Sequence, residues 1–343
     1  KEEEVVVKKS ILSLALVAVL FLGLIPGTVY AEERDFVIDG NGILTAYNGP
    51  GGDVVIPNGV RYVGFLGTFN GTEIDSGYVF AGRKDITSVT IPNSVIYIGK
   101  GAFAGCTGLT SVTIPNSVNR TGTEIFSGCT GLTDVIISGS VSKVETAAFM
   151  GCINLKNVTL CDGIKEIGGD SFRGCVNLTS IFIPDSVSTI ESISFLDCTS
   201  LTDVRIPKNT TIKGNAFKGT PWQEKQGDWV VINGTLVEYR GDQTTVTLPD
   251  NITTIGSYWY DGDWSELKSV TIPNSVTTIE DHAFSQLSGL TSVNIPNGVT
   301  DIGMSAFEGC GLISVTLPDS VKTIGARAFG GCYELTSITI PNS

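Results

Sequence analysis

Eight cysteines are the residues of this 343-residue chain that are best suited to chemistry. A disulfide needs Cβ atoms about 3.8 Å apart, whereas equivalent side chains on neighbouring stacked strands lie about 4.8 Å apart. No C-x-x-C pair or histidine-rich partner indicates zinc. We therefore predict a buried, reduced ladder, and expect only Cys161, which replaces a strand-ending proline, to be exposed. The other seven stand three positions after a phenylalanine that recurs along the chain: Cys106, Cys129, Cys152, Cys175, Cys198, Cys310 and Cys332.

Histidine chemistry would depend on a single residue, His282. The same position of other copies holds Gly, Asp, Asn, Ser or Arg, which indicates a solvent-facing side chain. A Ser/His/Asp or Cys/His triad needs a histidine held in a cleft beside its partners. The chain also has no phosphate loop of the G-x-x-x-x-G-K-[ST] type. We therefore predict a protein that is not an enzyme and has no cofactor.

Residues 261–266 read D-G-D-W-S-E and resemble half of a calcium loop. The stretch lacks Gly at the sixth place and Glu at the twelfth, which excludes an EF-hand. No metal site is predicted, and a weaker calcium site at the surface stays open as an alternative.

The cysteines belong to a unit that recurs along the chain. Residues 86–106 read ITSVTIPNSVIYIGKGAFAGC, and residues 109–129 read LTSVTIPNSVNRTGTEIFSGC. Tyr260 takes the place of the phenylalanine between two blocks of units, which gives about eleven copies and predicts a repeat architecture. Within each block the phenylalanine returns every 22 or 23 residues, at positions 80, 103, 126, 149, 172, 195 and 217, then 284, 307 and 329.

Each unit is expected to contribute a short strand and a second short extended piece. Leu109, Val112 and Ile114 fall on one face in the L-x-x-L-x-L manner, and Pro115 ends the strand because it lacks an N–H. One unit buries too few side chains to fold alone, so the units must stack into one solenoid. In the clearest copy we expect eight inward side chains: Ile86, Val89, Ile91, Val95, Ile98, Ala102, Phe103 and Cys106.

Two segments break the period and match each other at a constant offset of 192 residues. Leu44 and Tyr47 correspond to Leu236 and Tyr239, and each segment has an apolar run, a Gly-containing turn and a second strand. We predict two inserted β-hairpin modules in a mainly β leucine-rich-repeat solenoid. The predicted parts are a signal peptide at 1–31, an N-terminal capping hairpin at 32–60, a repeat block at 61–220, a second hairpin module at 221–252 and a second repeat block at 253–343.

The first 31 residues have the pattern of a secretory signal. Lys8 and Lys9 precede an apolar run at 11–25, and Val29 and Ala31 supply the small residues of a cleavage site. The run is shorter than the roughly 20 residues that span a bilayer, so no membrane span is expected in the mature chain. The chain starts without Met and stops within a repeat, and we expect it to be part of a longer protein. Its net charge of −13 argues against a nucleic-acid partner.

The L-T-S-V-T-I-P-N-S-V and A-F-x-G-C strings resemble those of BspA-like leucine-rich-repeat surface proteins, over about residues 36–343. The resemblance implies a curved solenoid at the cell surface that binds host extracellular or matrix proteins, glycans or other cells. It implies no catalytic residues.

The leading interpretation is a secreted or cell-surface adhesion protein that binds its partner through the solenoid face. The alternative is a structural stalk that displays a domain beyond residue 343, and ice or crystal binding is a third reading of the Thr/Ser rows. Four adjacent repeats depart from those rows, at strand positions that should point outward. We therefore predict ligand contacts at Ile136, Phe182 and Arg205, since such side chains favour interface centres.

Overall fold

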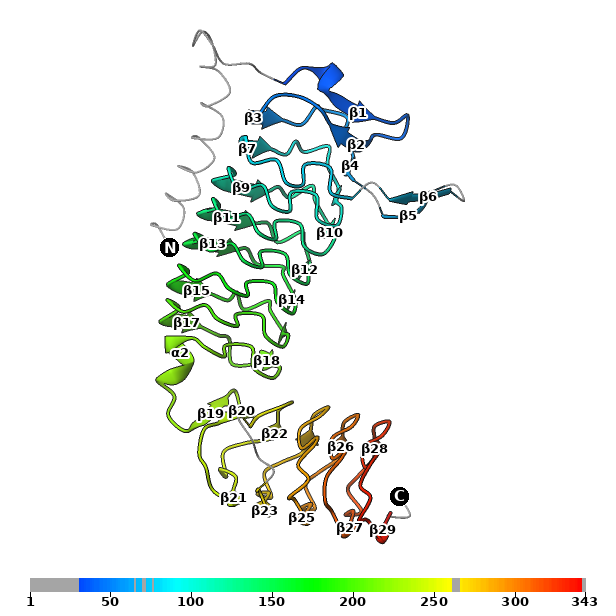
Figure 1. Cartoon of the computed structure of the whole chain (residues 1–343), viewed down its shortest axis with the longest axis vertical. Coiled ribbons are helices and arrows are strands. Elements are labelled where there is room, and N and C mark those ends of the chain that lie inside the picture. The colour runs from blue at the N-terminus through cyan, green and yellow to red at the C-terminus, as the bar shows by residue number, and fades with distance from the viewer. Residues whose placement is uncertain (1–30, 65, 70–71, 76, 261–265, 341–343) are drawn as a thin grey trace.

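The computed structural model describes residues 31–64, 66–69, 72–75, 77–260 and 266–340. Within this part the chain winds into stacked coils, one coil to each repeat, and the mainly β solenoid predicted from the sequence is confirmed. Figure 1 shows two stacks, one running from blue to green and one from yellow to red, which meet at a sharp bend beside α2 (Pro221–Glu224). We call this bend the elbow. The predicted signal peptide and most of the calcium-like stretch lie outside the described residues.

Each coil contributes a long strand to one face of its stack. Neighbouring long strands pair in parallel and in register, as Val112 with Val135 and Val135 with Val158. In the first stack these strands are β3 (Gly52–Val55), β7 (Ile86–Thr90), β9 (Ser111–Ile114), β11 (Asp134–Ile137), β13 (Asn157–Leu160), β15 (Ser180–Phe182) and β17 (Asp203–Arg205). In the second they are β21 (Thr245–Thr247), β23 (Ser269–Thr271), β25 (Ser292–Asn294), β27 (Ser314–Thr316) and β29 (Ser337–Thr339).

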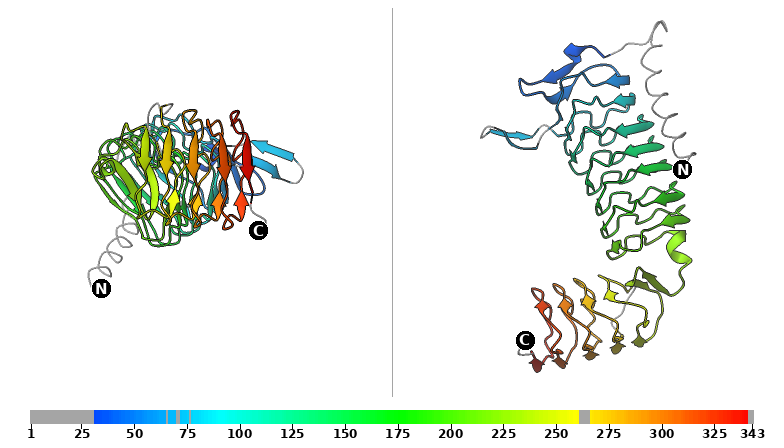
Figure 2. Two further views of the ribbon diagram at one scale, coloured as in Figure 1. Left: turned by 90° about the horizontal axis from the view of Figure 1, so that it is seen from below. Right: turned by 180° about the vertical axis from the view of Figure 1, so that it is seen from behind.

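A two-residue strand follows the turn at the end of each long strand and forms the opposite, short-strand face. In Figure 1 and in the right-hand view of Figure 2, these strands line the inside of the elbow, while the long strands lie outside. In the first stack they are β4 (Tyr62–Val63), β8 (Tyr97–Ile98), β10 (Arg120–Thr121), β12 (Lys143–Val144), β14 (Glu166–Ile167), β16 (Thr189–Ile190) and β18 (Thr211–Ile212). In the second they are β22 (Thr254–Ile255), β24 (Thr278–Ile279), β26 (Asp301–Ile302) and β28 (Thr323–Ile324).

Antiparallel hairpins stand where the period breaks, as predicted. β1 (Phe36–Ile38) pairs with β2 (Ile43–Tyr47) after the 3-10 turn η1 (Glu33–Asp35), and β19 (Trp229–Ile232) pairs with β20 (Thr235–Tyr239). Tyr47 contacts Phe80 at 5.1 Å between ring centroids, so the first hairpin closes the start of the core. A third hairpin, β5 (Leu66–Phe69) with β6 (Thr72–Asp75), projects from the first stack in Figure 1.

The recurring phenylalanines form a stacked column through the core of each block. Their ring centroids lie 4.9 to 5.4 Å apart with interplanar angles of 1 to 12°. Trp222 closes the first column against Phe217, and Trp259, beside Tyr260, opens the second against Phe284. The eight inward side chains predicted for residues 86–106 are all buried.

The ladder cysteines run beside this column and, apart from Cys332, are buried as predicted. Among the described residues, no disulfide joins any two of them. Each ladder thiol donates to the carbonyl of the phenylalanine one coil earlier, as Cys129 Sγ does to Phe103 O at 3.1 Å. Burial raises the pKa of Cys152 to about 12, which suppresses the reactive thiolate. Cys161 is half-buried, so the expectation that it is exposed is wrong. Cys332 is also half-buried, because no described coil packs over the last one.

The residue two positions before each phenylalanine, or before Tyr260, has a left-handed backbone, with φ between 50 and 61°. We call this position the left-handed slot. Gly101 is the one glycine among the eleven residues at this slot, so the other side chains adopt a conformation that costs about 1–2 kcal/mol each. The expectation that the slot faces solvent is wrong for several copies, since Ser305 is 3% exposed and His282 is half-buried. The left-handed slot accepts different residue types because the copies share its backbone conformation and do not share a degree of exposure.

Candidate binding surface

The long-strand face of the first stack is a regular polar surface. Along each strand the apolar residues point inward and the intervening residues point outward, so that Val112 is buried between exposed Ser111 and Thr113. Parallel pairing in register places equivalent outward residues in rows that cross the strands. One row, the Thr113 row, contains all three residues predicted as ligand contacts: Val55, Thr90, Thr113, Ile136, Thr159, Phe182 and Arg205.

Phe182 and Arg205 are brought together at one end of this row. They are register partners on β15 and β17, and the Arg205 guanidinium carbon lies 4.3 Å from the centre of the Phe182 ring. Phe182 is 51% exposed and the side chain of Arg205 is 60% exposed. Cation–π contact at such a separation stabilises by about 0.5–1 kcal/mol at exposed sites. The pair therefore forms a flat, amphipathic platform whose geometry is fixed by two paired strands.

Ile136 is separated from this platform. It lies on β11, with Thr159 of β13 between its strand and the strand of Phe182. The side chain is half-buried, so the prediction that it is an exposed apolar contact is wrong in this respect. Its register neighbours Thr113 and Thr159 flank it on both sides and cover part of its surface.

The surroundings of the platform are polar and already hydrogen-bonded. Asp185, in the turn after β15, lies 3.8 Å from the Arg205 guanidinium. Two strands away, Asn157 donates to Asp134 at 2.7 Å and Thr133 donates to the same carboxylate at 2.5 Å. These two hydrogen bonds lower the pKa of Asp134, so it is ionised at neutral pH. A polar rim around a small aromatic centre is the usual anatomy of a recognition surface.

The remaining candidates for chemistry are placed apart from one another. His282 stacks on Tyr258 at 5.2 Å, in the turn of a second-stack coil. Among the described residues, no three or more His, Cys, Asp or Glu side chains are grouped so as to hold a metal ion. In that same part of the chain, no helix has the length and apolar character needed to cross a bilayer.

Sequence reasoning missed two contributors to the surface. Val55, at the other end of the Thr113 row, is 57% exposed and stands in an otherwise Thr-rich series. Asp185 follows the proline of its turn, and its approach to Arg205 depends on turn geometry, for which the sequence holds no signal.

The fold and this face define the chain as a leucine-rich-repeat solenoid of the two-sheet kind. The model for the BspA type leucine rich repeat region matches in six copies, over residues 72–149, 122–226 and 253–343. The chain belongs to this family. Among proteins of curated function, none matches the sequence.

Several solved structures are similar in fold. A leucine-rich cell surface protein from Faecalibacterium prausnitzii is 24% identical, with 92% of this chain and 96% of that one covered and a TM-score of 0.46. A leucine-rich repeat protein from Bacteroides ovatus is also 24% identical, with 94% and 89% covered and a TM-score of 0.40. The pneumococcal vaccine antigen PcpA is 18% identical, with 92% and 82% covered and a TM-score of 0.37.

Proposed function

We propose that this protein is an exported, non-enzymatic cell-surface protein that binds a protein or glycan partner through the long-strand face of its first stack. The observation that carries the proposal is the exposed Phe182–Arg205 pair on a mainly polar sheet. Family membership supports a surface role, and a long rigid sheet suits large ligands.

The platform has the features of a binding hot spot. Aromatic and arginine side chains dominate the energy of interfaces, and a pre-formed pair loses little side-chain entropy when a partner docks. The surrounding Thr and Ser side chains would contribute shape and few strong contacts. We therefore assign the centre of recognition to Phe182 and Arg205, with Ile136 at its margin.

The test is a double variant, Phe182→Thr with Arg205→Thr, compared with Val55→Thr as the matched control. Val55 lies in the same row and is similarly exposed, but is remote from the platform. Binding would be measured to immobilised collagen, laminin and fibronectin, to a glycan array and to epithelial cells. Because each hot-spot residue contributes at least about 1–2 kcal/mol, we expect the double variant to lose more than tenfold in affinity. The thermal midpoint should be unchanged, since neither side chain is in the core.

Equal attachment by the double variant and the wild type would contradict the proposal. In that case the second candidate, a rigid spacer, would be favoured by the continuous phenylalanine column of the first stack.

A further inference from the structure

The elbow interrupts the hydrogen-bond rows of the short-strand face. In regular coils the carbonyl of the second strand residue accepts from the next coil, as Ile190 O does from Lys213 N at 2.9 Å. At the elbow β18 is the last strand of its sheet, and β22 pairs with β20 instead. Among the described residues, no hydrogen bond reaches the carbonyl of Ile212. The last coil of the first stack therefore presents an acceptor that a neighbouring coil would otherwise cover.

One side chain partly takes the place of the missing coil. The Asn233 amide donates to Thr210 O at 2.8 Å and to Pro207 O at 3.0 Å. This closes the turn of the last coil and leaves its strand edge open toward the second stack.

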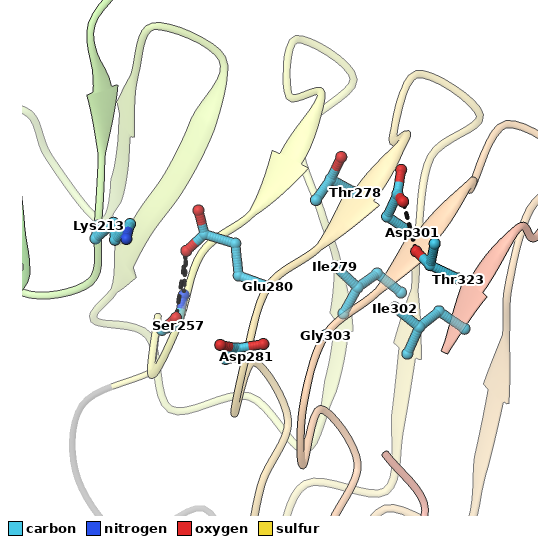
Figure 3. Close-up of a pocket in the computed structure, with 10 residues that line it drawn as sticks. All are labelled: Lys213, Ser257, Thr278, Ile279, Glu280, Asp281, Asp301, Ile302, Gly303 and Thr323. Atoms are coloured by element: carbon cyan, nitrogen blue, oxygen red, sulfur yellow. Dashed lines mark hydrogen bonds between the residues drawn. The ribbon is translucent and has the colours of Figure 1, made fainter. Parts of the chain in front are cut away.

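Two adjoining pockets lie at the elbow, where both stacks contribute to their lining. Their volumes are about 270 and 380 Å³. They share Thr278 and Glu280 and together approach the size of small-ligand sites. Figure 3 shows Lys213 of the first stack facing Ser257 and Glu280 of the second, with Asp301 and Thr323 further along. We call the two together the elbow pocket.

Glu280 is the central acidic residue of this pocket. Its Oε2 accepts from the backbone N of Ser257 at 3.0 Å and from the Ser257 hydroxyl at 3.3 Å, while no hydrogen bond to its Oε1 is seen among the described residues. Burial raises the pKa of Glu280, and the Ser257 hydrogen bonds and the charge of Lys213 offset this only in part. A carboxylate kept in a cleft at such a cost is a candidate for ligand binding.

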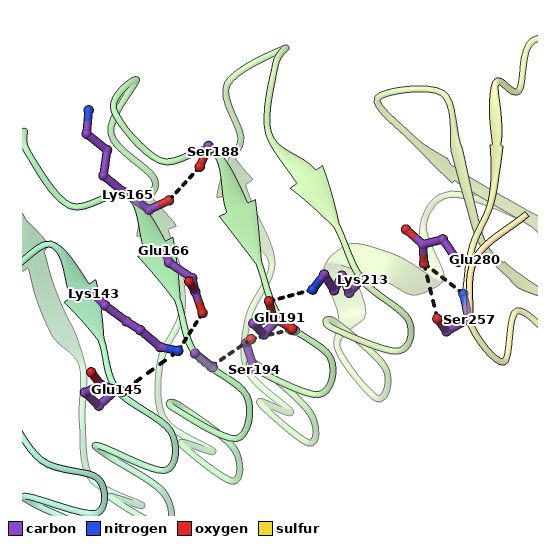
Figure 4. A network of polar contacts seen from close by, with 11 residues as sticks. Lys143, Glu145, Lys165, Glu166, Ser188, Glu191, Ser194, Lys213, Ser257 and Glu280 are labelled. Atoms are coloured by element: carbon purple, nitrogen blue, oxygen red, sulfur yellow. Dashed lines mark hydrogen bonds and ion pairs between the residues drawn. The ribbon is translucent and has the colours of Figure 1, made fainter. Parts of the chain in front are cut away.

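Elsewhere on the same face, charged side chains pair from coil to coil. Lys143 contacts Glu166 at 2.7 Å, and Lys213 contacts Glu191 at 2.8 Å, as Figure 4 shows. Glu280 departs from this pattern because its own coil-to-coil contact is to Ser257.

The remaining polar groups of the pocket include both donors and acceptors. Asp301 accepts from the Thr300 and Thr323 hydroxyls, and Asp281 accepts from the backbone N of Met304 at 2.6 Å. Each carboxylate therefore already has an internal partner, which lowers its demand for a cation. Further hydrogen bonds can be formed by the hydroxyls and by the carboxylate and carbonyl oxygens of the pocket. The ammonium groups of Lys208 and Lys213, the two lysines that line it, can also donate further hydrogen bonds.

We propose that the elbow pocket binds a neutral saccharide, with Glu280 accepting hydrogen bonds from its hydroxyls and Lys213 and Thr278 completing the contacts. A polyhydroxylated ring supplies both donors and acceptors, so its hydroxyls can pair with the carboxylates, the ammonium groups and the threonine hydroxyls of this lining. The site goes beyond the proposed function because it lies on the short-strand face, inside the elbow, and uses none of the platform residues.

The experiment is calorimetric titration of the full chain with glucose, galactose, N-acetylglucosamine and their disaccharides. We expect at least one to bind, with Kd in the millimolar range or tighter. Glu280→Gln should weaken that binding at least tenfold, and Thr278→Val should weaken it severalfold. Glu280→Gln should also unfold at the same or a higher temperature, since it removes a half-buried charge whose pKa is raised by burial, so loss of binding would not reflect loss of the fold.

Glu166→Gln is the matched control, since Glu166 lies on the same face but outside the pocket, and it should bind as the wild type does. The platform variant with Phe182→Thr and Arg205→Thr should also bind normally, which separates this proposal from the preceding one. Absence of saccharide binding by the wild type, normal binding by Glu280→Gln, or binding of lysine amide in place of saccharides would each overturn it.

Discussion

Replacing Phe149 by Ala tests whether the stacked column is the main source of stability in the first block. Phe149 is fully buried, and its ring lies 5.4 Å from that of Phe126 and 5.4 Å from that of Phe172. Truncation of a buried phenylalanine costs about 3–5 kcal/mol, and each lost aromatic pair contributes about 0.5–1.5 kcal/mol beyond burial. Because two pairs are lost in a closed column, we expect a cost near the upper limit, about 5 kcal/mol.

Phe329→Ala is the matched control. Phe329 is half-buried and stacks on one neighbour, Phe307, at 5.3 Å. With about half the burial and one aromatic pair, we expect a cost of about 1.5–2.5 kcal/mol.

Urea unfolding followed by circular dichroism and by tryptophan fluorescence measures both variants. All four tryptophans lie after residue 220, and Trp222 contacts Phe217 at the end of the first column, so fluorescence reports from the elbow onward. A cost below about 2 kcal/mol for Phe149→Ala, or equal costs for the two variants, would refute the idea that the column acts as a continuous core.

Three further outcomes are expected. A chromogenic thiol reagent should label at most Cys161 and Cys332 in the native protein and all eight cysteines in denaturant; mass spectrometry showing disulfides between coils would contradict the reduced ladder. Folding raises the pKa of Glu280 above its ordinary value of 4.5, so the native state holds the proton more tightly than the unfolded state does. The free energy of unfolding should therefore fall as pH rises from about 4.5 through the native pKa, and thermal melts of Glu280→Gln should lack this pH dependence. Gly214→Ala would place a Cβ 2.1 Å from Ser257 O across the elbow. We therefore expect about 1–3 kcal/mol of destabilisation and an altered small-angle scattering profile. An unchanged profile and an unchanged melt would show that the stacks do not meet there.

The solenoid could be predicted from the sequence because each inward position recurs. Val112 and Phe126 have equivalents in nearly every unit, so a chance pattern is excluded, and the 192-residue offset identified both hairpins. The alignment of Phe182 with Arg205 followed from the same period, since parallel strands in register bring equivalent positions together. Their ring-to-guanidinium contact depends on side-chain rotamers, which the period does not determine.

The elbow could not be predicted, because it depends on small departures from contacts that the other coils also make. The Asn233 amide stands where regular coils have a turn hydroxyl, such as Thr210 Oγ1, which donates to Val187 O. A Cβ on Gly214 would lie 2.1 Å from Ser257 O, closer than the 3.2 Å from Ser192 O at the equivalent Gly169. The left-handed slot was misread for a related reason. Side chains as different as those of Ala147 and Arg327 share it, and residue type alone did not reveal the common backbone.

The open strand edge at Ile212 also has a mechanical consequence. Within each stack, a pull on the two chain ends is resisted by rows of backbone hydrogen bonds between successive coils. Across the elbow the short-strand row is missing, and side-chain contacts such as those of Asn233 carry more of the load. Under shear at a surface, the joint should therefore yield before either stack, and the protein would lengthen there while both stacks keep their shape.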